Sequence, residues 1–225
     1  FEINETISNY PNNRQVIDTT EGDTTIIQLP QIGRIYSANI NSVSSGTWSR
    51  LANGDSLWRI QINSNSGLYI MLIFNQFYIP ETSKLYIYST DRSQVLGAFT
   101  GKNNTEFQKF TSSPIKANSI IVEFLKPATV SEKEKLCIQS IGLITESFDS
   151  SLPEEFGSSG QCMINAKCPE FEDWCNQRRS VALIVRILQN DGEILLGTGS
   201  LITNERKDGK PLLLTAFHLI DTNDN

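Results

Sequence analysis

Short apolar runs alternate with polar turn residues over the first two thirds of the chain. Between Leu57 and Asn63, the residues Trp58, Ile60 and Ile62 occupy every second position, a period of two that predicts a strand with one buried face. Runs of similar composition, rich in Ile, Val, Tyr and Phe, recur up to about residue 145. The predicted strands are Thr25–Leu29, Arg34–Ile40, Leu57–Asn63, Leu68–Phe74, Lys84–Ser89, Val95–Thr100, Ser119–Leu125 and Leu136–Ile144.

This series of strands shows no helical periodicity, so we predict an all-β fold whose N-terminal part is an antiparallel β-sandwich of jelly-roll or immunoglobulin-like type. Asn53-Gly54 favours a hairpin turn, because both residues tolerate positive φ. The triplet Gly54-Asp55-Ser56 imitates a protease nucleophile loop, but Leu57-Trp58-Arg59 follows where glycines would be needed. We interpret it as a turn followed by the start of a strand.

Composition changes after Thr145, where Ser, Glu and Gly replace the β-branched residues. A segment of this kind cannot bury enough apolar surface to order itself. We therefore expect a sandwich domain over residues 1–146, a linker that is easily cut by proteases over 147–160, and a second domain over 161–225. The second domain contains predicted strands at Val181–Leu188, Ile194–Ile202 and Pro211–Phe217, and Gly197 and Gly199 inside a strand indicate a close approach of other atoms.

The last of these strands leads to His218, the only histidine in the chain. An apolar run that ends in Thr-Ala-x-His is typical of a buried strand that delivers an imidazole to the rim of a barrel, where it can act as a general base. A single histidine after an apolar run is, however, more often a satisfied edge residue than a catalyst. The residues upstream decide between these two interpretations.

The net charge of −6 and the pI near 4.9 argue against a nucleic-acid or anionic-membrane partner, because both need a basic face. The longest apolar runs are far shorter than the roughly 18 to 20 residues that span a bilayer. We therefore predict no nucleic acid and no membrane span, and the sequence leaves the oligomeric state open.

The four cysteines are candidates for disulfides rather than for a metal site. Cys162, Cys168 and Cys175 are spaced C-x5-C and C-x6-C, and Cys137 lies further upstream. This spacing lacks the C-x2-C pattern of zinc knuckles, so we predict no metal and no cofactor. In an exported protein, four cysteines allow three internal pairings.

Two strand segments together resemble the first barrel of chymotrypsin-like serine proteases: the Gly-Ser-Leu segment Gly199-Ser200-Leu201 and the segment Thr215-Ala216-Phe217-His218. More narrowly, Cys162, Cys168-Pro169-Glu170, Trp174 and Arg179-Ser180-Val181-Ala182 resemble the mature N-terminus of bacterial lysyl endopeptidase-type enzymes. The N-terminal half is similar to the β-rich propeptide domain of these enzymes at Trp58-Arg59-Ile60, Phe77-Tyr78-Ile79-Pro80, Gly97-Ala98-Phe99-Thr100 and Val122-Glu123-Phe124.

The resemblance implies an incomplete chymotrypsin-like β-barrel after the sandwich, with His218 as the base of a catalytic triad. The triad order His, Asp, Ser places the other two members downstream of His218. No serine follows His218 here, and Asp221 and Asp224 follow too closely to hold the far ring nitrogen. The 225 residues by themselves are therefore expected to be inactive, as the prodomain and base of a secreted, periplasmic or cell-surface precursor that acts on proteins or peptides once completed.

The sequence also departs from the family. The usual Cys after the histidine is Leu219, and its usual partner in the glycine-rich strand is Gly197, so both halves of one disulfide are absent together. The resemblance implies that Cys162 and Cys168 pair with cysteines beyond Asn225, while Cys137 and Cys175 would be free to pair with each other.

An alternative function is a non-catalytic extracellular binding or adhesion module in which the sandwich is the working part. Exposed tyrosines would then make the contacts, although cross-strand packing is the simpler interpretation of such residues. The candidates are Tyr69, Tyr86 and Tyr88.

Overall fold

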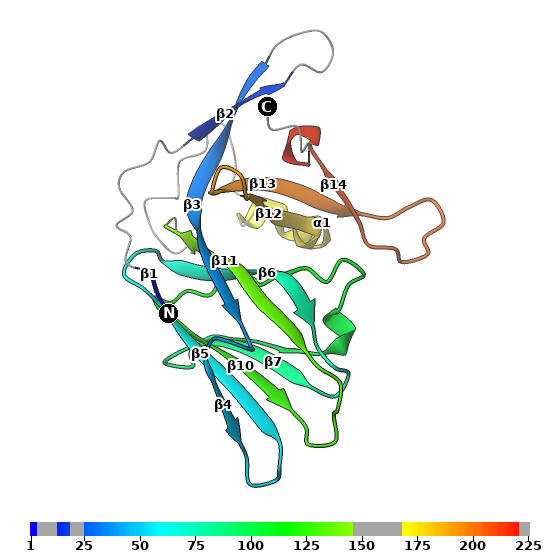
Figure 1. Ribbon diagram of the computed structural model, residues 1–225. Coiled ribbons are helices and arrows are strands. Elements are labelled where there is room, and N and C mark those ends of the chain that lie inside the picture. The colour runs from blue at the N-terminus through cyan, green and yellow to red at the C-terminus, as the bar shows by residue number, and fades with distance from the viewer. Residues whose placement is uncertain (4–12, 19–24, 146–167, 221–225) are drawn as a thin grey trace. The chain divides into compact units, whose positions relative to one another are not determined.

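The computed structural model describes residues 1–3, 13–18, 25–145 and 168–220, with the backbone alone for 13–18 and 25–30 (Figure 1). Strands dominate and the helices are few and short, which confirms the all-β prediction. None of the helices in the described part is long and apolar enough to cross a membrane.

The chain forms two compact units, neither of which is continuous in sequence. Unit 1 contains Phe1–Tyr10, Gly33–Glu146 and Gln189–Glu193, and unit 2 contains Pro11–Ile32, Ser147–Leu188 and Ile194–Asn225. The limits expected from composition, near residues 146 and 161, lie outside the described residues and stay predictions.

The first sheet of unit 1 follows the period of two seen in the sequence. In β5 (Ser56–Ser64), Trp58 and Ile62 are buried while Arg59 is exposed. β10 (Ser119–Lys126) pairs antiparallel with β5 and places Phe124 opposite Trp58. The order is β1-β5-β10-β7-β8 with β4 also paired to β5, where β1 is Glu2–Ile3, β4 is Thr47–Arg50, β7 is Lys84–Ser89 and β8 is Val95–Phe99. A 3-10 turn, η2 (Gly101–Asn103), follows β8.

The second sheet of unit 1 is centred on β11 (Lys135–Ile144). It lies between β3 (Thr25–Asn41) and β6 (Tyr69–Tyr78) and is antiparallel to both. The short β9 (Phe110–Thr111) pairs antiparallel with β6 on the side away from β11. Only the part of β3 from Gly33 onward belongs to unit 1. The pairing of β11 shifts register between Ile138 and Ser140, which marks a bulge.

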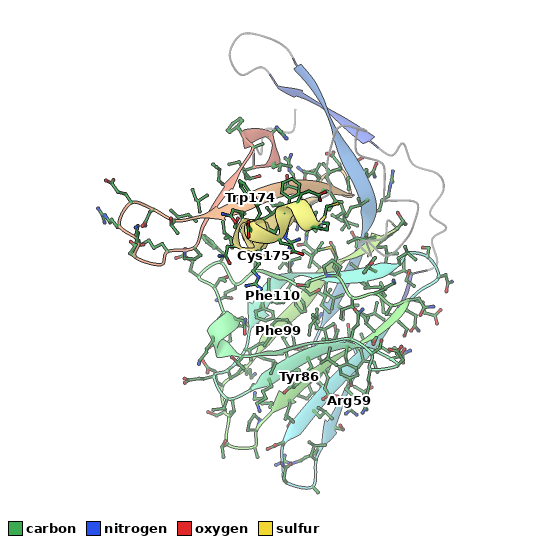
Figure 2. The ribbon with its side chains drawn as sticks, turned by 180° about the vertical axis from the view of Figure 1, so that it is seen from behind. Arg59, Tyr86, Phe99, Phe110, Trp174 and Cys175 are labelled. Carbon is green, nitrogen blue, oxygen red and sulfur yellow. The ribbon has the colours of Figure 1, made fainter. Side chains whose placement is uncertain are left out.

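One apolar core is enclosed between these two sheets, so the predicted sandwich is confirmed. Trp58 and Phe124 from the first sheet and Phe74 from the second are each at most 1% exposed. Phe99 and Phe110 meet between the layers with ring centroids 4.8 Å apart (Figure 2). Burial of each such side chain contributes about 1.5–3 kcal/mol to folding.

Most strands predicted between residues 25 and 145 are present, with two kinds of difference. Thr25–Leu29 and Arg34–Ile40 are one strand, β3, because the backbone stays extended through Pro30 to Gly33. β4 was not predicted, because all four of its residues are exposed and show no apolar alternation. Gly54 has φ +87° in the turn between β4 and β5, as Asn53-Gly54 predicted.

Unit 2 contains three strands in the C-terminal part of the chain. They are β12 (Val181–Leu188), β13 (Glu193–Ile202, with Glu193 in unit 1) and β14 (Leu212–Thr215), with β13 between the other two. The described strands of this unit do not close into a barrel. A hairpin of β2 (Asn13–Asp18) with the first residues of β3 belongs to the same unit.

Two short helices precede β12 and were not predicted. η3 (Pro169–Trp174) begins with a proline in its first turn and carries Glu170 and Glu172 there, a position where acidic side chains favour a helix N-terminus. α1 (Cys175–Ser180) follows directly. Both are too short for a 3.6-residue pattern to show in the sequence.

Candidate active site

His218 lies on a 3-10 turn, η4 (Phe217–Leu219), that follows β14. The prediction that the strand runs on to Phe217 is wrong: β14 ends at Thr215, and Leu219 N–H donates to Ala216 O at 3.1 Å, which closes the turn. The histidine is half-buried. The turn thus presents the imidazole just beyond the strand end.

The structure pairs the two segments that carry the protease resemblance. β13 and β14 are antiparallel, with Gly199 opposite Thr215 and Ser200 opposite Leu214. The Thr215 hydroxyl also donates to Thr198 O at 2.8 Å. The Gly-Ser-Leu and Thr-Ala-x-His segments are therefore direct neighbours in the sheet.

Gly197 and Leu219, the positions where the resemblance leads one to expect a disulfide, lie in contact. A Cβ placed on Gly197 would be 2.4 Å from Leu219 Cδ1 and 3.0 Å from its Cγ. Leu219 is 7% exposed and packs with Leu188 and Leu195 in the small core of unit 2. A buried leucine thus occupies the space beside the glycine, which also explains why position 197 carries no side chain.

Arg186 was missed by the sequence analysis. Its Nη1 donates to the main-chain oxygen of His218 at 2.8 Å, across 32 residues of sequence. The available signal was that Arg186 is the one charged residue in the otherwise apolar β12.

No hydrogen bond or ion pair joins the His218 imidazole to any residue that the structure describes. Asp221 and Asp224 lie outside the described residues, so their exclusion as triad members stays a prediction. An imidazole is the side chain that most often serves as a general base in catalysis.

The candidate disulfide cysteines are unpaired where they are described. Cys137, Cys168 and Cys175 are free thiols, and Cys162 lies outside the described residues. The pairing of Cys137 with Cys175 would join the two units and stays a prediction. Arg178 Nη2 donates to Cys175 Sγ at 3.2 Å. Burial raises the pKa of Cys137, which makes its thiol less reactive. Among the described residues, no three His, Cys, Asp or Glu side chains gather where a metal could bind.

The tyrosines considered for a binding face are mostly inaccessible. Tyr69 is 7% and Tyr88 9% exposed, so neither presents a free ring. Tyr88 OH donates to Glu123 Oε2 at 2.8 Å, and Arg59 Nε donates to the same oxygen at 2.7 Å. Burial, followed by the bond to Glu123, raises the pKa of Tyr88. Tyr86 is half-buried opposite Glu123, which indicates cross-strand packing rather than a contact surface.

Comparison with known protein families gives a match to the C-terminal part of the chain. Residues 156–225 match the family model described as lysyl endopeptidase, C-terminal domain. This match supports a lysyl endopeptidase-type protein. The matched range contains η3 through η4, including His218, Gly197 and Arg186.

Proposed function

We propose that this chain is part of the precursor of a lysyl endopeptidase-type serine protease. Residues 1–146 form its β-sandwich prodomain, residues 161–225 begin its protease domain, and residues 147–160 contain the maturation site. His218 is the general base that takes the proton from a nucleophilic serine supplied downstream.

One observation carries the proposal: the family match over residues 156–225 coincides with a sheet in which the Gly-Ser-Leu and Thr-Ala-x-His segments are paired. A triad base must lie where its ring can reach a nucleophile from another part of the fold, and His218 is half-buried on the turn η4 just after β14. Enzymes of this type are typically secreted, which fits an extracellular location.

The source gene provides the first test. Codons downstream of Asn225 for an aspartate and a Gly-Asp-Ser-Gly-Gly segment would support the proposal. A stop codon directly after Asn225 would contradict it.

A fluorophosphonate probe provides the second test. The complete gene product should label at one serine, and His218→Gln should slow labelling at least about 100-fold, because general-base catalysis contributes about 10²–10⁴-fold. Arg206→Gln, an exposed change in the loop before β14, should label at the original rate. The 225 residues alone should not label, and labelling of any serine in them would refute that part of the proposal.

No described feature favours the alternative of a binding or adhesion module. Its candidate contacts Tyr69 and Tyr88 are buried in the sandwich. We therefore propose the protease precursor alone.

A further inference from the structure

The hydrogen bond to the His218 carbonyl comes from the only charged side chain of β12. Arg186 is half-buried on β12, whose other residues are Val, Ala, Leu and Ile. Taking a guanidinium out of water costs free energy unless its donors are satisfied. Its bond to the His218 carbonyl therefore helps to offset this cost, and a bond from a charged donor is stronger than a neutral one.

The carbonyl that Arg186 binds belongs to the middle residue of the short turn η4. Within η4 and its end, Ala216 O accepts from Leu219 N–H at 3.1 Å and Phe217 O accepts from Ile220 N–H at 2.9 Å. The carbonyl of His218 comes next, at the C-terminal end of the turn, where arginine side chains commonly bind. Arg186 therefore fixes the end of the turn on which the histidine lies.

The main chain is also held at Leu219, the residue that follows His218. Leu219 is buried beside Gly197, while Phe217 on the other side of His218 is 57% exposed and provides no comparable anchor. The backbone of His218 is thus held by a polar contact at its own carbonyl and by an apolar contact at the following side chain.

We propose that Arg186 is a positioning residue for His218, which acts with the Leu219–Gly197 contact to fix the main chain of the histidine and so the direction of its imidazole. A general base must be held within about 0.5 Å of its productive position. The inference deepens the proposed function and rests on it for the role of the imidazole.

Because the chain has a single histidine, nuclear magnetic resonance can observe this position alone. In protein labelled at histidine with ¹⁵N and ¹³C, the original sequence should give one sharp imidazole signal and a backbone order parameter of about 0.85 at His218. Arg186→Met should lower the order parameter below about 0.6 and broaden or split the imidazole signal. Arg186→Lys should restore much of the order, because an ammonium can still donate to the carbonyl.

Arg179→Met is the matched control, because it makes the same chemical change on the exposed side of α1. It should leave the histidine signals unchanged. The methyl signals of Leu188, Leu195 and Leu219 report whether the core of unit 2 remains folded.

An unchanged His218 order parameter in a folded Arg186→Met protein would overturn the proposal. If Arg186→Met unfolds, Arg186→Gln is measured in its place, because glutamine is polar but shorter than arginine. The same loss of order at His218 is expected. Loss of the core methyl signals in all three variants, Lys included, would show a purely structural role and would also overturn the proposal. The His218 signals do not depend on what the gene encodes after Asn225 or on labelling by the fluorophosphonate. This inference and the proposed function can therefore fail separately.

Discussion

At the scale of single residues, Gly197 and Leu219 are in packing contact at the two positions where the family resemblance implies a disulfide. A disulfide and a buried leucine both tie the strand β13 to the turn that carries His218, but the leucine does so through apolar contacts that need no oxidising environment. The loss of two cysteines is thus compatible with a histidine that remains in place.

A double-mutant cycle tests this packing. Gly197→Ala should lower the free energy of unfolding of unit 2 by about 1–3 kcal/mol, because the new methyl group meets the Leu219 side chain at 2.4 Å. In the Leu219→Ala background the same change should cost less than about 0.5 kcal/mol, since the space is then open. Urea unfolding followed by the Leu188 and Leu195 methyl signals measures both values, and equal costs in the two backgrounds would contradict the interpretation.

The turn after β7 contains a carboxylate with a shifted pKa. Hydrogen bonds from the Ser89 hydroxyl, the Ser93 N–H and the Ser93 hydroxyl lower the pKa of Asp91 from 3.8 to about 2. Since the folded pKa lies below the unfolded value, the stabilisation is complete above about pH 4 and is lost as the pH falls through about 2. The Asp91 carboxyl ¹³C signal should titrate near pH 2 together with the Ser93 amide, and Asp91→Asn should abolish the amide transition. A midpoint near 3.8 would show that these bonds are absent in solution.

At the scale of elements, the sequence predicts those strands in which apolar residues occupy every second position. β5, β7 and β10 were found within one residue at either end, because apolar side chains recur at every second position along them. The short helices η3 and α1 lack a repeat long enough to detect.

The candidate site shows the same limit. The sequence pointed to His218 and to the Gly-Ser-Leu and Thr-Ala-x-His segments, which are recognised by local pattern, whereas their pairing came from the structure. Arg186 could not be found this way, because its bond to His218 spans 32 residues and depends on how β12 lies beside the turn.

β10 offers a test of the alternation, because adjacent residues face opposite sides. Phe124 is fully buried between the two sheets of unit 1, so Phe124→Ala should lower the free energy of unfolding by about 3–5 kcal/mol. Leu125→Ala, on the half-exposed outer face, should cost about 1 kcal/mol. Guanidinium unfolding of both variants measures the difference, and similar costs would contradict the assignment of the faces.

At the scale of the whole molecule, composition predicts where the chain is most easily cut. The segment 147–160 is rich in Ser, Glu and Gly and contains Glu154 and Glu155, directly before the start of the family match at residue 156. Brief digestion with a glutamate-specific protease should cut first at these residues. Mass spectrometry of the fragments identifies the bond, and a Glu154→Gln, Glu155→Gln variant should resist. First cuts at Glu132 in the loop before β11 would count against a linker at this place.

The distribution of tryptophans has a consequence for how this protein is studied. Trp58 is 1% exposed in the sandwich core, whereas Trp174, the tryptophan on η3 of unit 2, is already 53% exposed. Indole emission shifts to longer wavelength when water reaches the ring, so unfolding of the sandwich changes the fluorescence strongly and unfolding around His218 changes it little. A melting curve recorded by intrinsic fluorescence therefore reports the sandwich, and a variant that has lost the candidate active site would look fully stable by that method.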